Sequence, residues 1–509
     1  MNNNNDNRRI AKNTIFLYLR MLLIMVVSLY TSRIILQALG VQDFGIYNVV
    51  GGVVAMFSMI SSSLTAAISR FFTYELGKKN LEHLSQIFSS SLFTQVALVL
   101  LLFICMESFG LWFVNYKMTI PIERVLAANW VLQCSIISFS IGIISASYNA
   151  AIIAYERMDA FAYIGIIEAI LKLLVAMVLL YGGSADLLVL YSILQLIVSV
   201  AIGLSYIIFG IKKLPGCAVY PKFNLNTFKE IFGYTTWSVF GSLSYAGYNY
   251  GYNILLNLFF DPAVNAARGV AVQVQNAVYS FANNFQASLN PQIIKNYSVR
   301  NIDRMHQLIF ASSKFSFFMM LLLSLPLTLE ADYLLNVWLV EVPPHAVNFV
   351  RLILITITFE CLAGPMICSN NATGKIKWFQ ILTNSVFILS VPVCYLILSF
   401  GCLPESIYIV YIATFFISQS IRYIIVFPSI SMKRSEYFRY VIARVMVVSI
   451  IAIPVPVFLC ILIPKSFFSF IVVSLTAMCM VIISVFFFGM TINERKFALA
   501  KIHGLKCHM

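Results

Sequence analysis

Charged residues are scarce in this chain of 509 residues: Asp, Glu, Lys and Arg together make up 11%, whereas hydrophobic residues make up 60%. A water-soluble domain carries about 25% charged residues, so the composition excludes a soluble globular protein. At about 20 apolar residues per span, the length accommodates about fourteen transmembrane helices joined by short loops. Little of the chain is then left for a separate soluble domain.

Patterns that bind metals or form disulfides are also missing. The ten cysteines lie mostly inside apolar runs, and the sequence has no CxxC pair and no Cys/His spacing typical of zinc sites. We therefore expect buried thiols, no metal and no cofactor. The net charge of +14 is spread in small groups between apolar runs rather than gathered on one element, so no nucleic-acid partner is expected.

The apolar runs predict an all-α polytopic membrane protein. The first run has no small-residue cleavage site, so we interpret it as a retained span. The predicted spans are residues 12–38, 45–75, 86–114, 122–153, 160–181, 187–211, 231–260, 263–297, 306–330, 346–370, 377–400, 405–430, 440–463 and 467–490.

Basic residues alternate between the two sides of this arrangement. With the N-terminus inside, almost every Lys and Arg between the spans falls on the inner side, and the outer loops contain only Lys117, Arg124 and Lys465. Because Lys and Arg are retained in the cytoplasm, we expect a bacterial inner-membrane protein with both termini cytoplasmic. The outer loops carry acidic residues instead: Asp43, Glu123, Asp186, Asp261, Glu330, Asp332, Glu341 and Glu405.

The longest inner connection follows the sixth span and divides the chain into two lobes of six helices and a final helix pair. Six spans return the chain to its starting side, so the lobes would be parallel repeats about an axis along the membrane normal. The predicted parts are a cytoplasmic stub (1–11), an N-lobe (12–211), a cytoplasmic linker (212–230), a C-lobe (231–430), two additional helices (431–490) and a basic cytoplasmic tail (491–509).

Two arginines lie about equally far below the outer ends of their spans. Arg33 shares a polar face with Tyr30 and Gln37, and Arg268 lies about five residues into the eighth span, or about 8 Å from its outer end. Charges in a membrane usually face protein or a wet cavity. The two residues therefore predict either a shared cationic cavity or anchoring at the outer leaflet, and the sequence leaves both open.

The seventh and eighth spans are the most polar in the chain. Such side chains can join helices, but their number exceeds what joining requires, and amide and phenol groups offer the donors and acceptors that sugar hydroxyls need. We therefore predict a polar cavity that accepts sugars. Its candidate residues are Tyr245, Asn249, Asn253 and Asn257 at i+4 spacing on the seventh span, and Gln275, Tyr279, Asn283 and Gln286 on the eighth.

Acidic residues inside spans are candidates for ion coupling. Glu168 and Lys172 stand at i and i+4 in the fifth span, which predicts either a neutralising pair or a coupling site. Glu360 in the tenth span has no basic residue at pairing distance on its helix, so it is the better candidate. Lys314, Arg422, Arg444 and Arg70 lie near inner ends, which predicts anchoring to headgroups, with a functional role as the alternative. Arg70 favours the alternative most, because it adjoins a polar stripe on its helix.

Several segments carry a family resemblance. The turn Leu39-Gly-Val-Gln-Asp-Phe-Gly-Ile-Tyr47 resembles the LG-x-x-[DE]-[FY]-G-x-Y segment of polysaccharide flippases, and Ser69-Arg-Phe71, Glu75-Leu-Gly-Lys-Lys79 and Asn290-Pro-Gln-Ile293 are similar to segments of the same family. Over nearly its full length the chain resembles Wzx-type O-antigen and capsule flippases of the multidrug/oligosaccharidyl-lipid/polysaccharide exporter superfamily.

The resemblance implies a function. Such proteins carry an undecaprenyl-pyrophosphate-linked oligosaccharide from the cytoplasmic to the periplasmic leaflet by alternating access, coupled to H⁺ or Na⁺. Membrane lipids, a polysaccharide polymerase and its chain-length machinery are the implied partners. Related flippases hold the pyrophosphate with arginines from the first, second and eighth spans, which implies Arg20 or Arg33, Arg70 and Arg268 here. Arginine suits this role because its planar fork meets phosphate oxygens in pairs.

Two other functions compete with this one. Multidrug efflux within the same superfamily would call for cavity carboxylates, and the first two spans contain arginines and no acid except Glu75, the last residue of the second. A polytopic polymerase or glycosyltransferase would need catalytic carboxylates or histidines in a sizeable outer loop. The longest outer loop, about 331–345, holds only Asp332, Glu341 and His345, so we do not expect an enzyme.

Overall fold

The structure is a computed structural model that describes residues 3–55, 58–116, 120–180, 186–217, 225–260, 262–339, 342–492 and 494–496. All regular elements among these residues are helices. The chain divides into two compact units: unit 1 comprises Met1–Leu243 and Ile294–Arg300, and unit 2 comprises Ser244–Ile293 and Asn301–Met509. The division thus falls inside a helix rather than in the linker 212–230, and the functional lobes proposed from the sequence stay a prediction.

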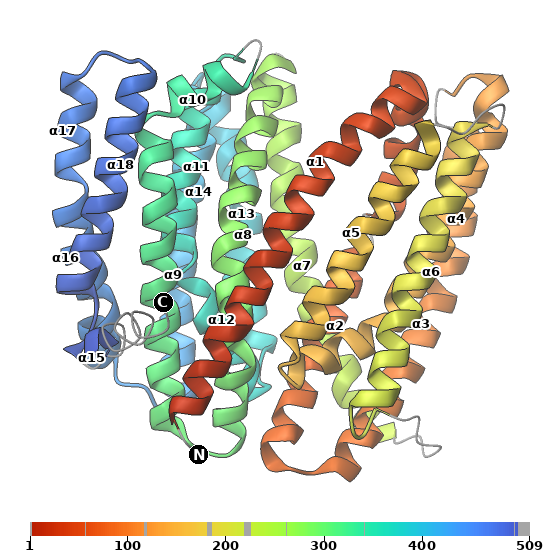
Figure 1. Cartoon of the computed structure of the whole chain (residues 1–509), viewed down its shortest axis with the longest axis horizontal. Helices are drawn as coiled ribbons and strands as arrows, with labels where there is room; N and C mark the ends of the chain where they lie inside the picture. Colours follow the sequence, from red (N-terminus) through yellow and green to blue (C-terminus); the bar gives the residue numbers. More distant parts are fainter. Residues whose placement is uncertain are drawn as a thin grey trace, which may run out of the picture. The chain divides into compact units, whose positions relative to one another are not determined.

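Unit 1 is built from long helices that pack along one another (Figure 1). In it α4 packs on α2, α3 and α6, and α1 packs on α5. The helices are α1 (Asn3–Ala55), α2 (Ser58–Lys78), α3 (Leu81–Tyr116), α4 (Val125–Ala154) after the short turn η1 (Ile122–Arg124), α5 (Met158–Leu180), α6 (Leu187–Lys213) and the first part of α7 (Leu225–Phe259).

A bend at Gly40 divides α1 into two arms. Gly40 has φ 73° and ψ 170°, which is not helical and is open to glycine without strain. The arm before the bend covers the first predicted span, and the arm after it continues toward α2 as the second. The turn that carries the family resemblance is therefore the bend between these arms.

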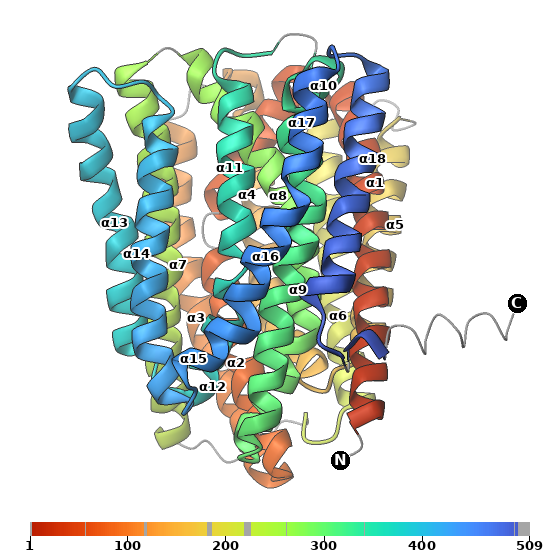
Figure 2. The same ribbon diagram turned by 90° about the vertical axis from the view of Figure 1, so that its left-hand side faces the viewer.

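Unit 2 contains the rest of α7, α8 up to Ile293 and all helices from α9 on, and Figure 2 shows α13 and α14 running side by side in it. Its long helices are α8 (Pro262–Ser298), α9 (Ile302–Leu329), α13 (Lys377–Ser399) and α14 (Ser406–Ser429). Its shorter elements are α10 (Ala331–Trp338), α11 (Ala346–Glu360), α12 (Ala363–Thr373), α15 (Arg434–Tyr437), η2 (Phe438–Ile442), α16 (Ala443–Ala452), α17 (Pro454–Leu462), α18 (Phe467–Ser484) and η3 (Val485–Gly489).

The apolar helices establish a multi-pass membrane protein. Within the described residues, nine helical segments are long and apolar enough to cross a bilayer, and ten if α11 and α12, bent by 40° at their junction, form one broken span. The other predicted spans fall on α1 with α2, on α7 and on α8, which are helical. Fourteen spans stay a prediction, whereas the all-α polytopic class is confirmed.

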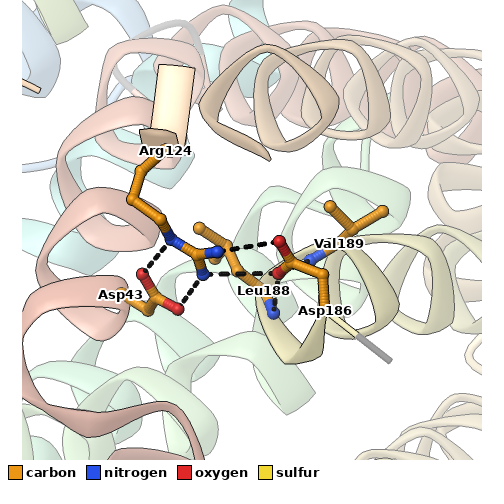
Figure 3. Close-up of polar contacts among 5 residues, drawn as sticks. All are labelled: Asp43, Arg124, Asp186, Leu188 and Val189. Carbon is orange, nitrogen blue, oxygen red and sulfur yellow. Dashed lines mark hydrogen bonds and ion pairs between the residues drawn. The ribbon is translucent and has the colours of Figure 1, made fainter. Parts of the chain in front are cut away.

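An ion cluster joins three segments of unit 1 (Figure 3). Arg124 donates from Nε to Asp43 at 2.9 Å and from Nη1 to Asp186 at 2.8 Å. Asp186 also caps α6 by accepting from the backbone N–H groups of Leu188 and Val189. These contacts place the α1 bend, the start of α4 and the start of α6 at the same end, as the charge pattern predicts for outer segments.

Candidate functional site

A pocket of about 460 Å³ opens between α7 and α8 within unit 2. The i+4 spacing of the asparagines on α7 brings Asn253 and Asn257 to one side of the pocket, and i+3 and i+4 steps on α8 bring Asn265, Arg268 and Gly269 to the other. The remaining lining residues are Ala266 and Val272. The pocket wall is therefore one arginine, three amides and small or apolar side chains.

Arg268 is the cation of this pocket, and only 6% of its surface is exposed. Its Nη1 donates to Asn253 Oδ1, and its Nη2 donates to Asn249 Oδ1 at 3.1 Å. The guanidinium also lies 6.0 Å from the ring centroid of Tyr252. The structure thus brings Arg268 together with two of the asparagines on α7, whereas the shared cavity predicted for Arg268 and Arg33 stays a prediction.

The charge of Arg268 is not neutralised by a carboxylate among the described residues. Both acceptors are amide oxygens, which satisfy hydrogen bonds without adding negative charge. A buried, uncompensated guanidinium attracts an anion, and its fork geometry matches phosphate or carboxylate oxygens. The pocket can therefore bind an oxyanion, with the surrounding amides available to hydroxyl groups.

A second polar cluster in unit 2 surrounds Glu360, the last residue of α11 at the α11–α12 bend. Tyr411 Oη donates to Glu360 Oε2 at 3.2 Å, and the hydroxyl groups of Tyr411 and Tyr248 are 3.3 Å apart. The Tyr248 ring stacks on those of Tyr411 and Phe387, and the Phe387 and Tyr411 rings are tilted by 45° to each other. The carboxyl group predicted for ion coupling therefore lies among phenols on α7 and α14.

Arg422 belongs to the same cluster, which the sequence prediction missed. Its side chain is 7% exposed, its Nη1 donates to Gln419 at 3.1 Å, and its guanidinium lies over the Phe387 ring. It interacts electrostatically with Glu360 without a direct ion pair between the two. Headgroup anchoring is therefore wrong for Arg422. The signal was present in a polar stripe along α14 at i+3 and i+4 steps: Tyr411, Thr414, Ser418 and Arg422.

Headgroup anchoring is also wrong for Lys314. Its side chain is 2% exposed, and its Nζ lies 2.5 Å from Glu494 Oε2. Arg444 donates to the Gly489 carbonyl oxygen at 3.1 Å. Both cations thus bond the chain after α18, where the sequence pattern suggested contacts with lipid.

The other predicted polar residues of α7 and α8 lie in different surroundings. Tyr245 is 51% exposed, and Tyr279 interacts electrostatically with Glu360. Gln286 is buried and donates to Ser316 Oγ and to the Cys361 carbonyl oxygen, so it holds the α11–α12 bend. Gln275 and Asn283 lie farther along α8 than the pocket lining. A glycan-facing role for these residues stays a prediction.

Among the described side chains of unit 1, Arg20 and Arg70 contact different aromatic groups. The Arg20 guanidinium stacks 4.1 Å from the Phe161 ring centroid on α5. Arg70 is 8% exposed and lies over Phe71, Tyr74 and Tyr234. The Arg33 side chain lies outside the described residues. Pyrophosphate contacts by these three arginines stay a prediction.

Glu168 and Lys172 form the ion pair that their spacing allows. Lys172 Nζ lies 2.6 Å from Glu168 Oε1, and both side chains are about a third exposed or more. This geometry favours the neutralising pair over a free coupling carboxylate. Glu360 is thus the stronger of the two candidates for ion coupling.

Comparison with solved structures identifies the fold. The chain matches a MATE transporter in its bent conformation with a TM-score of 0.74 at 13% identity, over 84% of this chain and 96% of that chain. It matches an outward-facing multidrug resistance MATE transporter of the MOP superfamily with a TM-score of 0.72 at 12% identity, over 83% and 96% of the two chains.

A third match is a MOP superfamily transporter from Pyrococcus furiosus, with a TM-score of 0.69 at 13% identity over 83% of this chain and 96% of that chain. That protein is described as having a binding pocket whose reverse polarity suggests a different function. No family model and no curated protein sequence matches this chain. The likeness is one of structure, and the chain has the fold of the MATE transporters of the MOP superfamily.

Proposed function

We propose that the protein flips an anionic, undecaprenyl-pyrophosphate-linked oligosaccharide from the cytoplasmic to the periplasmic leaflet of the bacterial inner membrane, for synthesis of a surface polysaccharide. In this proposal fourteen spans, with both termini cytoplasmic, form two lobes that alternate in access. A polysaccharide polymerase and its chain-length machinery take up the product. The fold supports the transport part of the proposal.

The observation that carries the choice of substrate is the state of Arg268. Its guanidinium is buried, faces a pocket and is bonded only to amide oxygens among the described residues. A cationic drug would be repelled by this charge, whereas a phosphate group would gain charge-assisted hydrogen bonds. Multidrug efflux is therefore the weaker alternative for this pocket. Arg20, Arg33 and Arg70 are further candidates for phosphate contacts in the proposal.

The proposal also assigns ion coupling to Glu360. A carboxyl group among phenols inside a membrane protein can exchange a proton, and it can also bind Na⁺. Its position at the break between α11 and α12 adds the negative end of the α11 dipole, which favours a cation there. Replacing external Na⁺ by choline at fixed pH separates the two ions, because only Na⁺ coupling would fail.

Glycan export tests the assignment of Arg268. In a strain whose only copy carries Arg268→Ala, surface glycan should be lost and the lipid-linked oligosaccharide should accumulate in the inner leaflet. Arg268→Lys should restore export only in part, because an ammonium lacks the fork. The matched control is Arg439→Ala, which removes an exposed arginine of unit 2. Immunoblots of the membrane fraction establish that each variant is present.

Two results would contradict the proposed flippase function or its substrate site. Normal export by Arg268→Ala at wild-type protein levels would exclude the pocket as the substrate site. Unchanged surface glycan in a deletion strain that becomes sensitive to cationic dyes would favour efflux instead.

A further inference from the structure

A continuous series of contacts joins the Arg268 pocket to Glu360 within unit 2. The Arg268 guanidinium lies 6.0 Å from the Tyr252 ring, and that ring meets the Tyr411 ring edge-on at a centroid distance of 6.3 Å. Tyr411 then donates to Glu360 at 3.2 Å. The pocket and the carboxyl group are thus separated by two aromatic side chains.

The helix α7 contributes to both ends of this series. Its Asn249 and Asn253 accept from Arg268, whereas the neighbouring Tyr248 and Tyr252 contact Tyr411. Tyr252 is fixed by a 2.6 Å hydrogen bond with Ser390 on α13. Any rearrangement of the asparagines on anion binding therefore acts on the helix that also carries the partners of Tyr411.

The hydroxyl group of Tyr411 has two possible hydrogen-bond directions. When Glu360 is ionised, Tyr411 must donate to it and can accept from Tyr248. When Glu360 is protonated, its O–H can donate to Tyr411, and Tyr411 is then free to donate to Tyr248, since either hydroxyl can be the donor at 3.3 Å. Protonation of Glu360 would thus reach α7 as a reversal of the Tyr411–Tyr248 hydrogen bond.

The other groups around Glu360 do not provide the hydrogen bond that Tyr411 makes with its carboxylate. Arg422 on α14 and Tyr279 on α8 interact with it electrostatically, as do Tyr245 and Tyr248 on α7 and the adjacent Cys361. Phe387 on α13 packs against the phenols, and Phe317 on α9 packs against Phe359. Among the described residues, Tyr411 rather than any of these groups has a hydrogen bond to the Glu360 carboxylate.

We propose that Tyr411 is a positioning residue that couples protonation of Glu360 to anion binding at Arg268. This inference rests on the proposed function, because it assumes that the pocket binds an anion and that Glu360 exchanges protons. An anion at Arg268 and a carboxylate at Glu360 disfavour each other, so affinity should fall as pH rises. Tyr411 amplifies this effect beyond what charge repulsion through space provides.

Binding of inorganic pyrophosphate to the purified protein in nanodiscs tests the inference by calorimetry between pH 5.5 and 8.5. The affinity of Glu360→Gln for pyrophosphate changes with pH only because pyrophosphate itself titrates. The ratio of wild-type affinity to Glu360→Gln affinity at each pH therefore isolates the effect of Glu360. We expect this ratio to change by about tenfold across the range, a usual size for coupling between sites. The same comparison is then made without the Tyr411 hydroxyl group, between Tyr411→Phe and the double variant Tyr411→Phe/Glu360→Gln. We expect the ratio of these two affinities to change no more than about twofold between pH 5.5 and 8.5.

Controls separate a positioning role from damage to the fold. Tyr395→Phe makes the same change on α13 at a side chain that is 47% exposed, and it should keep the wild-type pH dependence. Tyr411→Phe should also keep the wild-type thermal midpoint within a few degrees, because all ring contacts remain.

The outcomes distinguish the inference from the proposed function. A wild-type pH dependence in Tyr411→Phe would overturn the coupling role and leave the pocket assignment intact. Unchanged binding of pyrophosphate to Arg268→Gln would overturn the pocket assignment itself. Binding that needs Arg268 and loses its pH dependence in Tyr411→Phe supports both.

Discussion

A lysine buried in unit 2 has one carboxylate partner among the described residues. Lys314 on α9 is 2% exposed, and Glu494, which follows η3, supplies the oxygen 2.5 Å from its Nζ. Glu494 also accepts from the Thr491 backbone N–H at 2.7 Å, which fixes the carboxylate in place. A charge in such a position is stable only while it is paired, so Lys314 depends on the chain segment that follows η3.

Glu494→Gln should therefore destabilise the protein by about 3–5 kcal/mol, the usual cost of leaving one member of a buried pair without its partner. Denaturation of the purified protein in detergent measures the change. The double variant with Lys314→Met should recover most of the loss, because it removes the uncompensated ammonium. The matched control is Glu436→Gln, whose 3.8 Å pair with Lys433 is exposed and should contribute less than about 1 kcal/mol. If Glu494→Gln and Glu436→Gln lowered the free energy of unfolding equally, Lys314 would not depend on its pair with Glu494.

Glu405 gives unit 2 a pH dependence at the end predicted to be outer. Burial opposes ionisation of this carboxyl group, but hydrogen bonds from Asn348 and His345 outweigh it and hold the pKa of Glu405 below its usual 4.5. A lowered carboxyl pKa adds stability above pH 4.5, and this stability is lost as pH falls through the folded-state pKa.

Thermal midpoints measured from pH 7 to pH 3 should therefore show a fall below about pH 4.5 that is smaller in Glu405→Gln than in the wild type. The variant has no carboxylate at this position to lose, so the difference between the two curves reports Glu405 alone. Parallel curves would mean that the contacts with Asn348 and His345 add no net stability.

Among the elements, α1 depends on one glycine for its bend. At φ 73° a side chain would strain the backbone at Gly40, although a Cβ there would meet no atom within 4 Å. Gly40→Ala should therefore cost about 1–3 kcal/mol through backbone strain alone. Gly142→Ala in α4 is the matched control, since its Cβ also meets nothing within 4 Å and alanine favours a helix by about 0.5–1 kcal/mol. If Gly40→Ala were as stable as Gly142→Ala, the bend would not require the backbone conformation that favours glycine at position 40.

The ion cluster of Figure 3 contacts α1 just after this bend, at Asp43. Arg124→Met should loosen it, because Asp43 and Asp186 would then face each other without a cation. Amide hydrogen exchange should become faster in residues 41–47 and at the start of α6, while α3 keeps its rates. Unchanged exchange at both places would show that the cluster adds nothing to the bend.

The sequence predicted elements better than contacts between them. The i+4 asparagines of α7 indicated one polar face, and that face does meet Arg268, because helix geometry alone aligns these residues. The contact of Glu360 with Tyr411, 51 residues later, depends on how α11 packs on α14, which no local pattern encodes. Gln286 was assigned to sugars because the bend that takes its amide, at Cys361, is invisible in the hydropathy pattern.

For the whole molecule, the charge pattern makes a prediction about sidedness. Cys402 is exposed in the connection from α13 to α14, which is predicted to be outer. In intact spheroplasts, a membrane-impermeant maleimide should label Cys402, and Cys402→Ser should abolish most labelling. With Cys402→Ser as background, Lys375→Cys, in the exposed turn before α13, should react only after permeabilisation. The reverse pattern would invert the proposed topology.

The amide partners of Arg268 also bear on release. A transporter must let go of what it binds, and a guanidinium stripped of its guest would otherwise stand bare in a medium of low polarity. If the pocket binds an oxyanion as proposed, the incoming oxygens would replace those of Asn249 and Asn253 on the guanidinium, and the two asparagines would bond it again when the anion leaves. Binding and release would then each exchange one set of hydrogen bonds for another, so the guanidinium would keep hydrogen-bond partners in both states.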